Sequence, residues 1–65
     1  MKMLIEIRMD NDAFGDCGRS QSVETARILA EISKKIGANY SRLNGYEDRL
    51  RDINGNACGT VRVEA

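Results

Sequence analysis

The chain has 65 residues, and its ten lysines and arginines balance ten aspartates and glutamates. A neutral balance is atypical of proteins that coat nucleic acid, which are clearly basic, and of strongly acidic DNA mimics. No apolar run approaches the roughly 20 residues of a membrane span, and Glu6 and Arg8 interrupt the stretch that a signal peptide would need to be apolar. We therefore expect a cytoplasmic protein with one domain over residues 1–65 and a thin core.

Residues 1–9 alternate between apolar and polar side chains, which predicts a strand with one buried face. The predicted buried face carries Met1, Met3, Ile5, Ile7 and Met9. Leu4 is the one apolar side chain expected on the opposite face. Residues 10–20 are rich in Gly, Asp, Asn and Ser, as loops are, and we expect Phe14 to be buried beneath this loop.

Residues 21–36 show the clearest helical pattern. Their apolar side chains fill a wide arc, and the charged ones, Glu24 among them, gather in a narrow polar arc, as in a surface helix packed on a sheet. The apolar arc contains Val23, Ala26, Ile28, Leu29, Ala30, Ile32 and Ile36. Ser20 or Ser22 can cap the start of this helix, with Glu24 in the first turn, and Gly37 is the expected terminator.

Residues 47–64 are typical of a β-hairpin, preceded by a connector at 38–46 that fits either a short turn or an irregular strand. Asn54-Gly55 is a strong hairpin signal, because a type I′ turn needs positive φ at both central residues. The order strand, helix, strand, strand predicts an α+β fold: a two-layer β-α-β-β domain with a three-stranded antiparallel sheet and one amphipathic helix packed on one face. Every pairing is antiparallel if the last strand lies between the other two.

The hairpin has two alternative registers. A two-residue loop places the following side chains toward the helix: Tyr46, Leu50, Ala57, Val61 and Val63. The side chains that then face away from the helix are Arg49, Arg51, Cys58, Thr60 and Arg62. We favour this register because it gathers more large apolar groups, although it leaves Asp48 and Asp52 on the core side. A three-residue loop with a bulge would place Ile53 beside Ala57 instead.

No residue pattern predicts catalysis, a metal site or a cofactor. Without histidine, the usual general base and the commonest metal ligand are missing. Cys17 follows Asp16, whose charge should raise the pKa of the thiol, and in a reducing cytoplasm we expect Cys17 and Cys58 to be free thiols. The segments 10–16 and 52–56 mimic parts of a calcium-binding loop, but neither supplies the full ligand set. We expect polar loops that bond their own backbone.

Candidate binding residues come from the predicted sheet and from the loop before the helix. They are Arg8, Arg49, Arg51 and Arg62 on the sheet face away from the helix, and Asp10, Asp12 and Asp16 in the loop. Exposed arginines on a sheet can contact phosphates or base edges. The alternative is a solvated face on which Glu6, Glu47 and Glu64 balance the basic side chains. The open edges of such a sheet are also places where a partner or a second copy docks.

Four segments carry a resemblance: residues 1–9, 10–16, 26–29 and 50–61, the last containing Asp-Ile-Asn-Gly-Asn-x-x-Gly-Thr. They resemble small open reading frames of bacteriophages, prophages and other mobile elements. The resemblance implies a protein of a bacterial host cytoplasm that acts by binding. Some small proteins of this type block host defence, as anti-CRISPR proteins do. The resemblance assigns no catalytic residues.

Three functional hypotheses follow. The leading one is a non-enzymatic binding protein that inhibits or modulates a host protein complex, with a CRISPR effector as one candidate target. Because the chain is less acidic than a DNA mimic, we expect direct contact with protein. The alternative is a small nucleic-acid-binding regulator that uses the arginine-bearing sheet face, as a homodimer. The third is an assembly module that only associates with itself.

Overall fold

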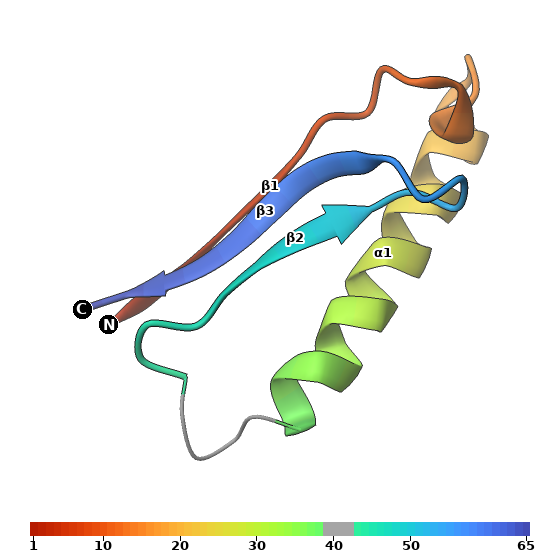
Figure 1. Ribbon diagram of the computed structural model, residues 1–65. Helices are drawn as coiled ribbons and strands as arrows, with labels where there is room; N and C mark the ends of the chain where they lie inside the picture. The colour runs from red at the N-terminus through yellow and green to blue at the C-terminus, as the bar shows by residue number, and fades with distance from the viewer. Residues whose placement is uncertain (39–42) are drawn as a thin grey trace.

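The computed structural model of the chain describes residues 1–38 and 43–65. In chain order it contains strand β1 (Lys2–Ile7), the 3₁₀ helix η1 (Asp12–Phe14), helix α1 (Gly18–Ala38), strand β2 (Glu47–Arg51) and strand β3 (Ala57–Glu64) (Figure 1). The strands form one antiparallel sheet in the order β1-β3-β2, with α1 against one face. The predicted α+β fold is confirmed, including the central place of the last strand. Only η1 was not predicted.

The core lies between α1 and the β2–β3 part of the sheet. Its buried side chains are Phe14, Ile28, Ile32, Leu50, Cys58 and Val61. Phe14 is fully buried, as predicted for the loop anchor. The apolar arc of α1 is narrower than predicted, because Val23 is 64% exposed and Leu29 is 40% exposed, whereas Glu24 from the predicted polar arc is buried. The helix therefore buries one narrow stripe rather than a broad face.

Helix α1 starts at residue 18 instead of 21 and runs to residue 38 instead of 36. Ser20 lies inside its first turn, where the hydroxyl donates to the carbonyl oxygens of Phe14 at 2.9 Å and Cys17 at 3.0 Å. The prediction that Ser20 or Ser22 caps the helix was therefore wrong, and so was Gly37 as its terminator. In the described part of the chain, no helix is both long and apolar enough to cross a membrane.

The connector before β2 is described only from residue 43 onward. The prediction for residues 39–42 lies outside the described residues. In the described part, the amide of Tyr46 donates to the carbonyl of Leu43 at 2.9 Å and closes a turn in which Gly45 has a φ of 83°. Of the two predicted alternatives, residues 43–46 therefore form the turn.

The hairpin loop differs from the favoured register. The amide of Asp52 donates to the carbonyl of Asn56 at 2.9 Å, which encloses a loop of three residues with Ile53 exposed. Gly55 has a φ of 86°, but among the described residues no side-chain-bearing residue has a positive φ. A type I′ turn needs positive φ at Asn54 as well, so the two-residue turn was wrong. The alternative three-residue loop is the one observed, but its predicted placement of Ile53 beside Ala57 was wrong, because Arg51 lies opposite Ala57.

A β-bulge follows this loop. Leu50 pairs with Gly59 but Arg51 pairs with Ala57, so Cys58 is the extra residue on β3. The bulge moves Cys58 into the core and leaves Ala57 exposed, the reverse of the prediction for these two residues. The remaining face assignments of the hairpin are confirmed, with Leu50, Val61 and Val63 buried and with exposed Arg49, Arg51, Thr60 and Arg62.

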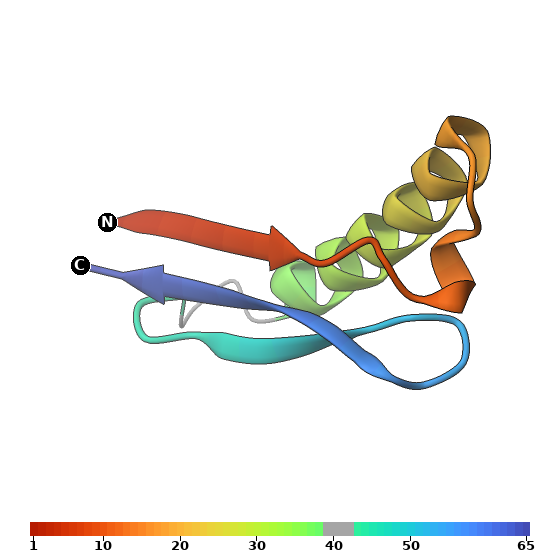
Figure 2. The same cartoon turned by 90° about the horizontal axis from the view of Figure 1, so that it is seen from above.

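The apolar face of strand β1 is less buried than the alternation of apolar and polar residues predicted. Met3 and Ile5 pair directly with the buried Val63 and Val61 and so share the helix side of the sheet, yet they are 36% and 42% exposed. Figures 1 and 2 show why, since the N-terminal end of β1 and the C-terminal end of β3 project together beyond the end of α1. Only Ile7, near the other end of β1, packs against the core.

Candidate functional site

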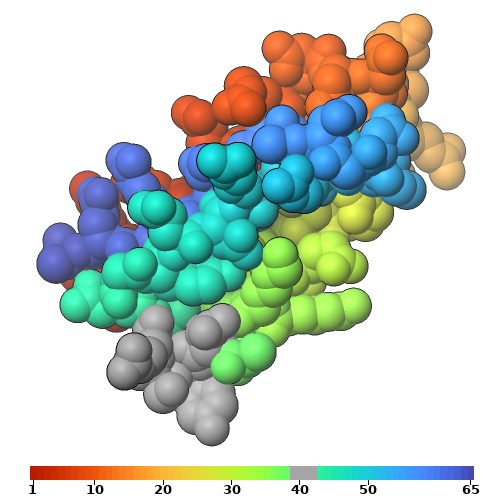
Figure 3. Space-filling view, viewed as in Figure 1, coloured from red at the N-terminus to blue at the C-terminus, as the bar shows by residue number. Residues whose placement is uncertain are grey.

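The sheet face opposite α1 gathers the predicted arginines. Arg49 and Arg51 lie two residues apart on β2, and Arg62 lies on the neighbouring β3. Arg49 is directly opposite Thr60 and therefore diagonal to Arg62, a spacing within reach of long side chains. In the space-filling view, side chains of the β2–β3 hairpin occupy the centre of the surface and no other segment lies over them (Figure 3).

Carboxylates neutralise only part of this face. Three exposed ion pairs lie at its margins: Lys2–Glu64 at 3.7 Å, Arg62–Glu64 at 3.6 Å and Arg8–Glu6 at 3.9 Å. Exposed pairs of this kind contribute little to stability. Arg51 donates to the carbonyl of Gly55 at 3.1 Å. Among the described residues, neither Arg49 nor Arg51 has an ion pair, so these two guanidinium groups are available to an acidic ligand.

A cleft of ≈ 650 Å³ runs along β2 between this face and α1. Its basic lining residues are Arg27, Lys35, Arg49, Arg51 and Arg62, and its acidic ones are Glu31, Glu47, Asp48 and Asp52. Such an alternation of charges is unlike a phosphate site, in which positive groups converge. It is compatible with the surface of another protein, which presents both signs.

The loop carboxylates do not join the arginines in one cluster. Asp10, Asp12 and Asp16 are all exposed, and within the described ranges no group of three or more His, Cys, Asp or Glu side chains could hold a metal ion. The residue that organises this loop is Asn11, which is not among the predicted binding residues. Its Oδ1 accepts the amide of Ala13 at 3.1 Å, an Asx turn that starts η1.

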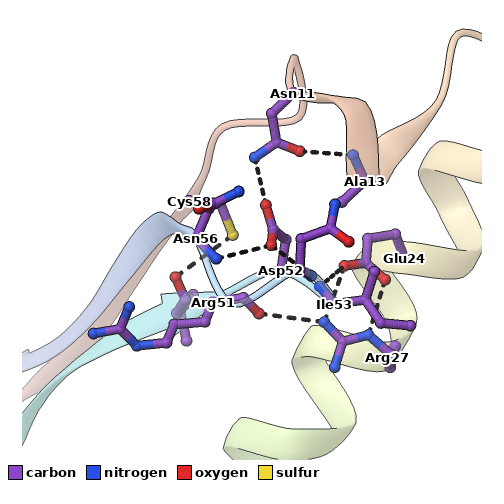
Figure 4. A network of polar contacts seen from close by, with 11 residues as sticks. Asn11, Ala13, Glu24, Arg27, Arg51, Asp52, Ile53, Asn56 and Cys58 are labelled. Carbon is purple, nitrogen blue, oxygen red and sulfur yellow. Dashed lines mark hydrogen bonds and ion pairs between the residues drawn. The ribbon is translucent and has the colours of Figure 1, made fainter.

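Asn11 also reaches a buried polar network that fastens the hairpin tip to the rest of the fold (Figure 4). Asp52 is only 4% exposed. Its carboxylate accepts the Nδ2 group of Asn11 at 2.7 Å and the amides of Asn54 at 2.9 Å and Asn56 at 3.0 Å. The sequence placed Asp52 on the core side without a partner, and these three donors explain how the fold tolerates it.

The second carboxylate of this network is Glu24, which is 6% exposed. Arg27 donates to both of its oxygens, at 2.8 and 2.9 Å, and the amide of Ile53 donates to Oε2 at 2.8 Å. The two hydrogen bonds from Arg27 are the main reason that the pKa of Glu24 is lowered. Arg27 also donates to the carbonyl of Arg51 at 3.2 Å. A carboxylate held ionised in this way braces the hairpin against α1 and is poorly suited to donate a proton.

The two cysteines occupy opposite environments, and both are free thiols. Cys17 is exposed just before α1, where a hydrogen bond with the Ser20 hydroxyl, at 3.4 Å, lowers the pKa of the thiol. The amides of Ser20 and Arg19 act in the same direction. The expectation that Asp16 would raise this pKa was therefore wrong, because donors at the start of the helix stabilise the thiolate.

Alkylation of the native protein should distinguish the two thiols. Burial, followed by the negative charge of Asp52, raises the pKa of Cys58. We therefore expect iodoacetamide to modify Cys17 alone at neutral pH and both cysteines after denaturation, as read by intact-mass spectrometry. A Cys17→Ser variant that stays unmodified until unfolded is the control. Equal labelling of Cys58 in the native protein would contradict the bulge that buries it.

Comparison with protein-family models, curated proteins and solved structures found no match. The candidate site therefore rests on its own geometry. Arg49, Arg51 and Arg62 come together as predicted, and Arg8 lies at the margin of the same face beside Glu6. The loop aspartates do not take part.

Proposed function

We propose that the chain is a small non-enzymatic binding protein that attaches the open face of its sheet to an acidic surface of a host protein complex. The observation that carries the proposal is the pair Arg49 and Arg51, which lie exposed on strand β2 of an uncovered face without an ion pair among the described residues. Guanidinium groups bind carboxylates through two parallel hydrogen bonds and lose little hydration in doing so.

Charge and composition favour protein over nucleic acid as the partner. Glu6, Glu47 and Glu64 share the open face with the arginines, and these carboxylates would repel a phosphate backbone. The described residues place no aromatic side chain there on which a base could stack. The resemblance to small proteins of phages and other mobile elements supports a bacterial host complex as the partner. A CRISPR effector is the first such complex to test.

Replacing both arginines should weaken capture of the partner. We expect the double variant Arg49→Ala, Arg51→Ala to bind at least about tenfold more weakly than the natural chain, because arginine is among the residue types that most often dominate the affinity of an interface. The measurement is capture from nuclease-treated bacterial lysate, followed by calorimetric titration of the identified partner. The matched control is Arg19→Ala, Lys34→Ala, which removes the same charge from exposed positions of α1 and should bind normally.

The outcomes separate the alternatives. A partner that disappears on nuclease treatment would replace this proposal with the nucleic-acid regulator, whose affinity falls steeply with salt. Equal loss in both double variants would show a general charge effect and contradict a site on the sheet. For the CRISPR target, DNA cleavage by a purified effector that is unchanged by excess chain would remove that complex as the partner.

A further inference from the structure

The outer edge of β1 is open and apolar. The amide of Arg8 donates to the carbonyl of Cys58 on β3 at 2.7 Å. Hydrogen-bonded pairs alternate along an antiparallel ladder, so the even-numbered residues of β1 bond β3. The amides and carbonyls of Met3, Ile5 and Ile7 therefore point outward, away from the sheet. Each of these three residues is apolar, and no β-bulge is recorded along β1.

The opposite edge of the sheet, on β2, is protected against pairing. Here the odd-numbered residues point outward, because the amide of Val63 donates to the carbonyl of Tyr46 at 2.8 Å. The outward amide of Arg49 is already bonded to the Asp48 carboxylate at 2.8 Å, and the outward carbonyl of Arg51 accepts Arg27. Charged side chains and capped backbone groups are the usual means of blocking an edge strand. Only β1 lacks them.

We propose that two copies of this chain pair through β1, antiparallel, about a two-fold axis that passes between their Leu4 residues. The two sheets then form one sheet of six strands, three from each copy, with both helices on the same face. In this register Met3 and Ile5 exchange backbone hydrogen bonds with Ile5 and Met3 of the second copy. This assembly is independent of the partner proposed for the open face.

Charge selects this register among those that the backbone allows. Centring on Leu4 sets Lys2 of each copy directly opposite Glu6 of the other, so the contact contains two opposite-charge pairs. Centring on Ile5 sets Lys2 opposite Arg8, and centring on Glu6 sets two glutamates together. Directly opposed like charges destabilise a strand pair, and opposite charges stabilise it. Within residues 1–38 and 43–65 of the single chain, the ion pairs of Lys2 and Glu6 are long and exposed, at 3.7 and 3.9 Å.

The same pairing would cover the apolar surface that α1 leaves open. Met3 and Ile5 lie on the helix side of β1 and are more than a third exposed. Leu29 is also exposed and lies one helical turn beyond Thr25, whose hydroxyl contacts the sulfur of Met9 at 3.1 Å. That face of α1 therefore borders the segment that directly follows β1. Two copies would place these side chains in one apolar strip between the two helices.

A charge swap tests the register. Native mass spectrometry and analytical ultracentrifugation of the untagged chain should show a dimer. Glu6→Lys alone places a lysine opposite Lys2 in both charge pairs of the contact. This repulsion should raise the dimer Kd about tenfold or more. Lys2→Glu together with Glu6→Lys should restore the natural affinity. As a matched control, Glu31→Lys makes the same charge change on an exposed part of α1 and should leave the dimer unchanged.

Cross-linking at the axis provides the second measurement. In a Cys17→Ser background, Leu4→Cys should oxidise to a disulfide-linked dimer, because directly opposed residues of a non-hydrogen-bonded pair bring their Cβ atoms within disulfide range. Lys2→Cys, which faces Glu6 in the pairing, should remain monomeric on a denaturing gel. A monomer at every concentration, or a dimer that ignores the charge swap and cross-links through Lys2→Cys instead, would overturn the proposal.

Discussion

Replacing Glu24 with alanine is expected to cost about 1 to 3 kcal/mol in the free energy of unfolding, as for other buried hydrogen-bonding groups that lose their partner. A domain of this size has only roughly 3 to 10 kcal/mol in total, so the variant should unfold at a clearly lower temperature than the natural chain. The change removes both oxygens that accept Arg27 and leaves the amide of Ile53 without its acceptor. Thermal unfolding followed by circular dichroism is the measurement.

The lowered pKa of Glu24 also fixes the direction in which stability changes with pH. Because the pKa of Glu24 is lowered in the folded state, the unfolded chain binds the proton more readily. The stabilisation is present above the unfolded pKa of about 4.3 and is lost as pH falls through the folded pKa. Asp48, whose pKa is lowered mainly by the amide of Arg49, adds a contribution of the same sign. The unfolding temperature should therefore fall steadily below about pH 5.

Two glutamine variants isolate the buried carboxylate. Glu24→Gln keeps an acceptor oxygen but removes the charge, so its unfolding temperature should be lower at neutral pH and should depend less on acid than that of the natural chain. Glu31→Gln, on an exposed part of the same helix, should shift stability by no more than about 0.5 kcal/mol and keep the natural acid dependence. If the two variants behaved alike, the Glu24–Arg27 pair would not brace the hairpin.

The sequence was sufficient for the architecture because its signals there are periodic and local. Alternation in residues 1–9, the helical spacing of Ile28 and Ile32 and the turn signal at Asn54-Gly55 each reflect which side chains leave water. Their order left one simple way to build a two-layer fold. The arginine face followed from the same alternation, since Arg49 and Arg51 are two residues apart on a strand.

The errors arose where side chains bond across distant segments. Asp52 accepts the amides of Asn54 and Asn56, and this bonding supports the three-residue loop over the tight turn that Asn54-Gly55 suggests. The loop in turn sets the bulge that buries Cys58. Similarly, the helical spacing predicts that Glu24 is exposed, because the spacing does not show that the amide of Ile53 in the hairpin loop donates to the Glu24 carboxylate. No local periodicity records such contacts, so a sequence pattern alone cannot reveal them.

Gly59→Ala is expected to be the most damaging single-methyl change in the chain. Gly59 lies opposite Ile7 in the β1–β3 ladder, and a Cβ built on it would clash with the carbonyl oxygen of Glu6 and approach the Cα of Ile7 at 3.0 Å. Both neighbours are backbone, so relief requires that the two strands separate. Overpacking of this kind typically costs about 1 to 3 kcal/mol, and occasionally more, and we expect the upper end, measured by urea unfolding.

Gly37→Ala is the matched control, because it adds the same methyl group where nothing lies within 4 Å. Gly37 is inside α1, so alanine there should stabilise the fold by roughly 0.5 to 1 kcal/mol. Opposite signs for the two variants would show that close approach of β1 and β3 is what requires glycine at position 59. A Gly59→Ala protein as stable as the natural chain would mean that β1 does not sit tightly against β3. Because β1 is an edge strand, loosening it should also lower the protection of its amides against hydrogen exchange before that of α1.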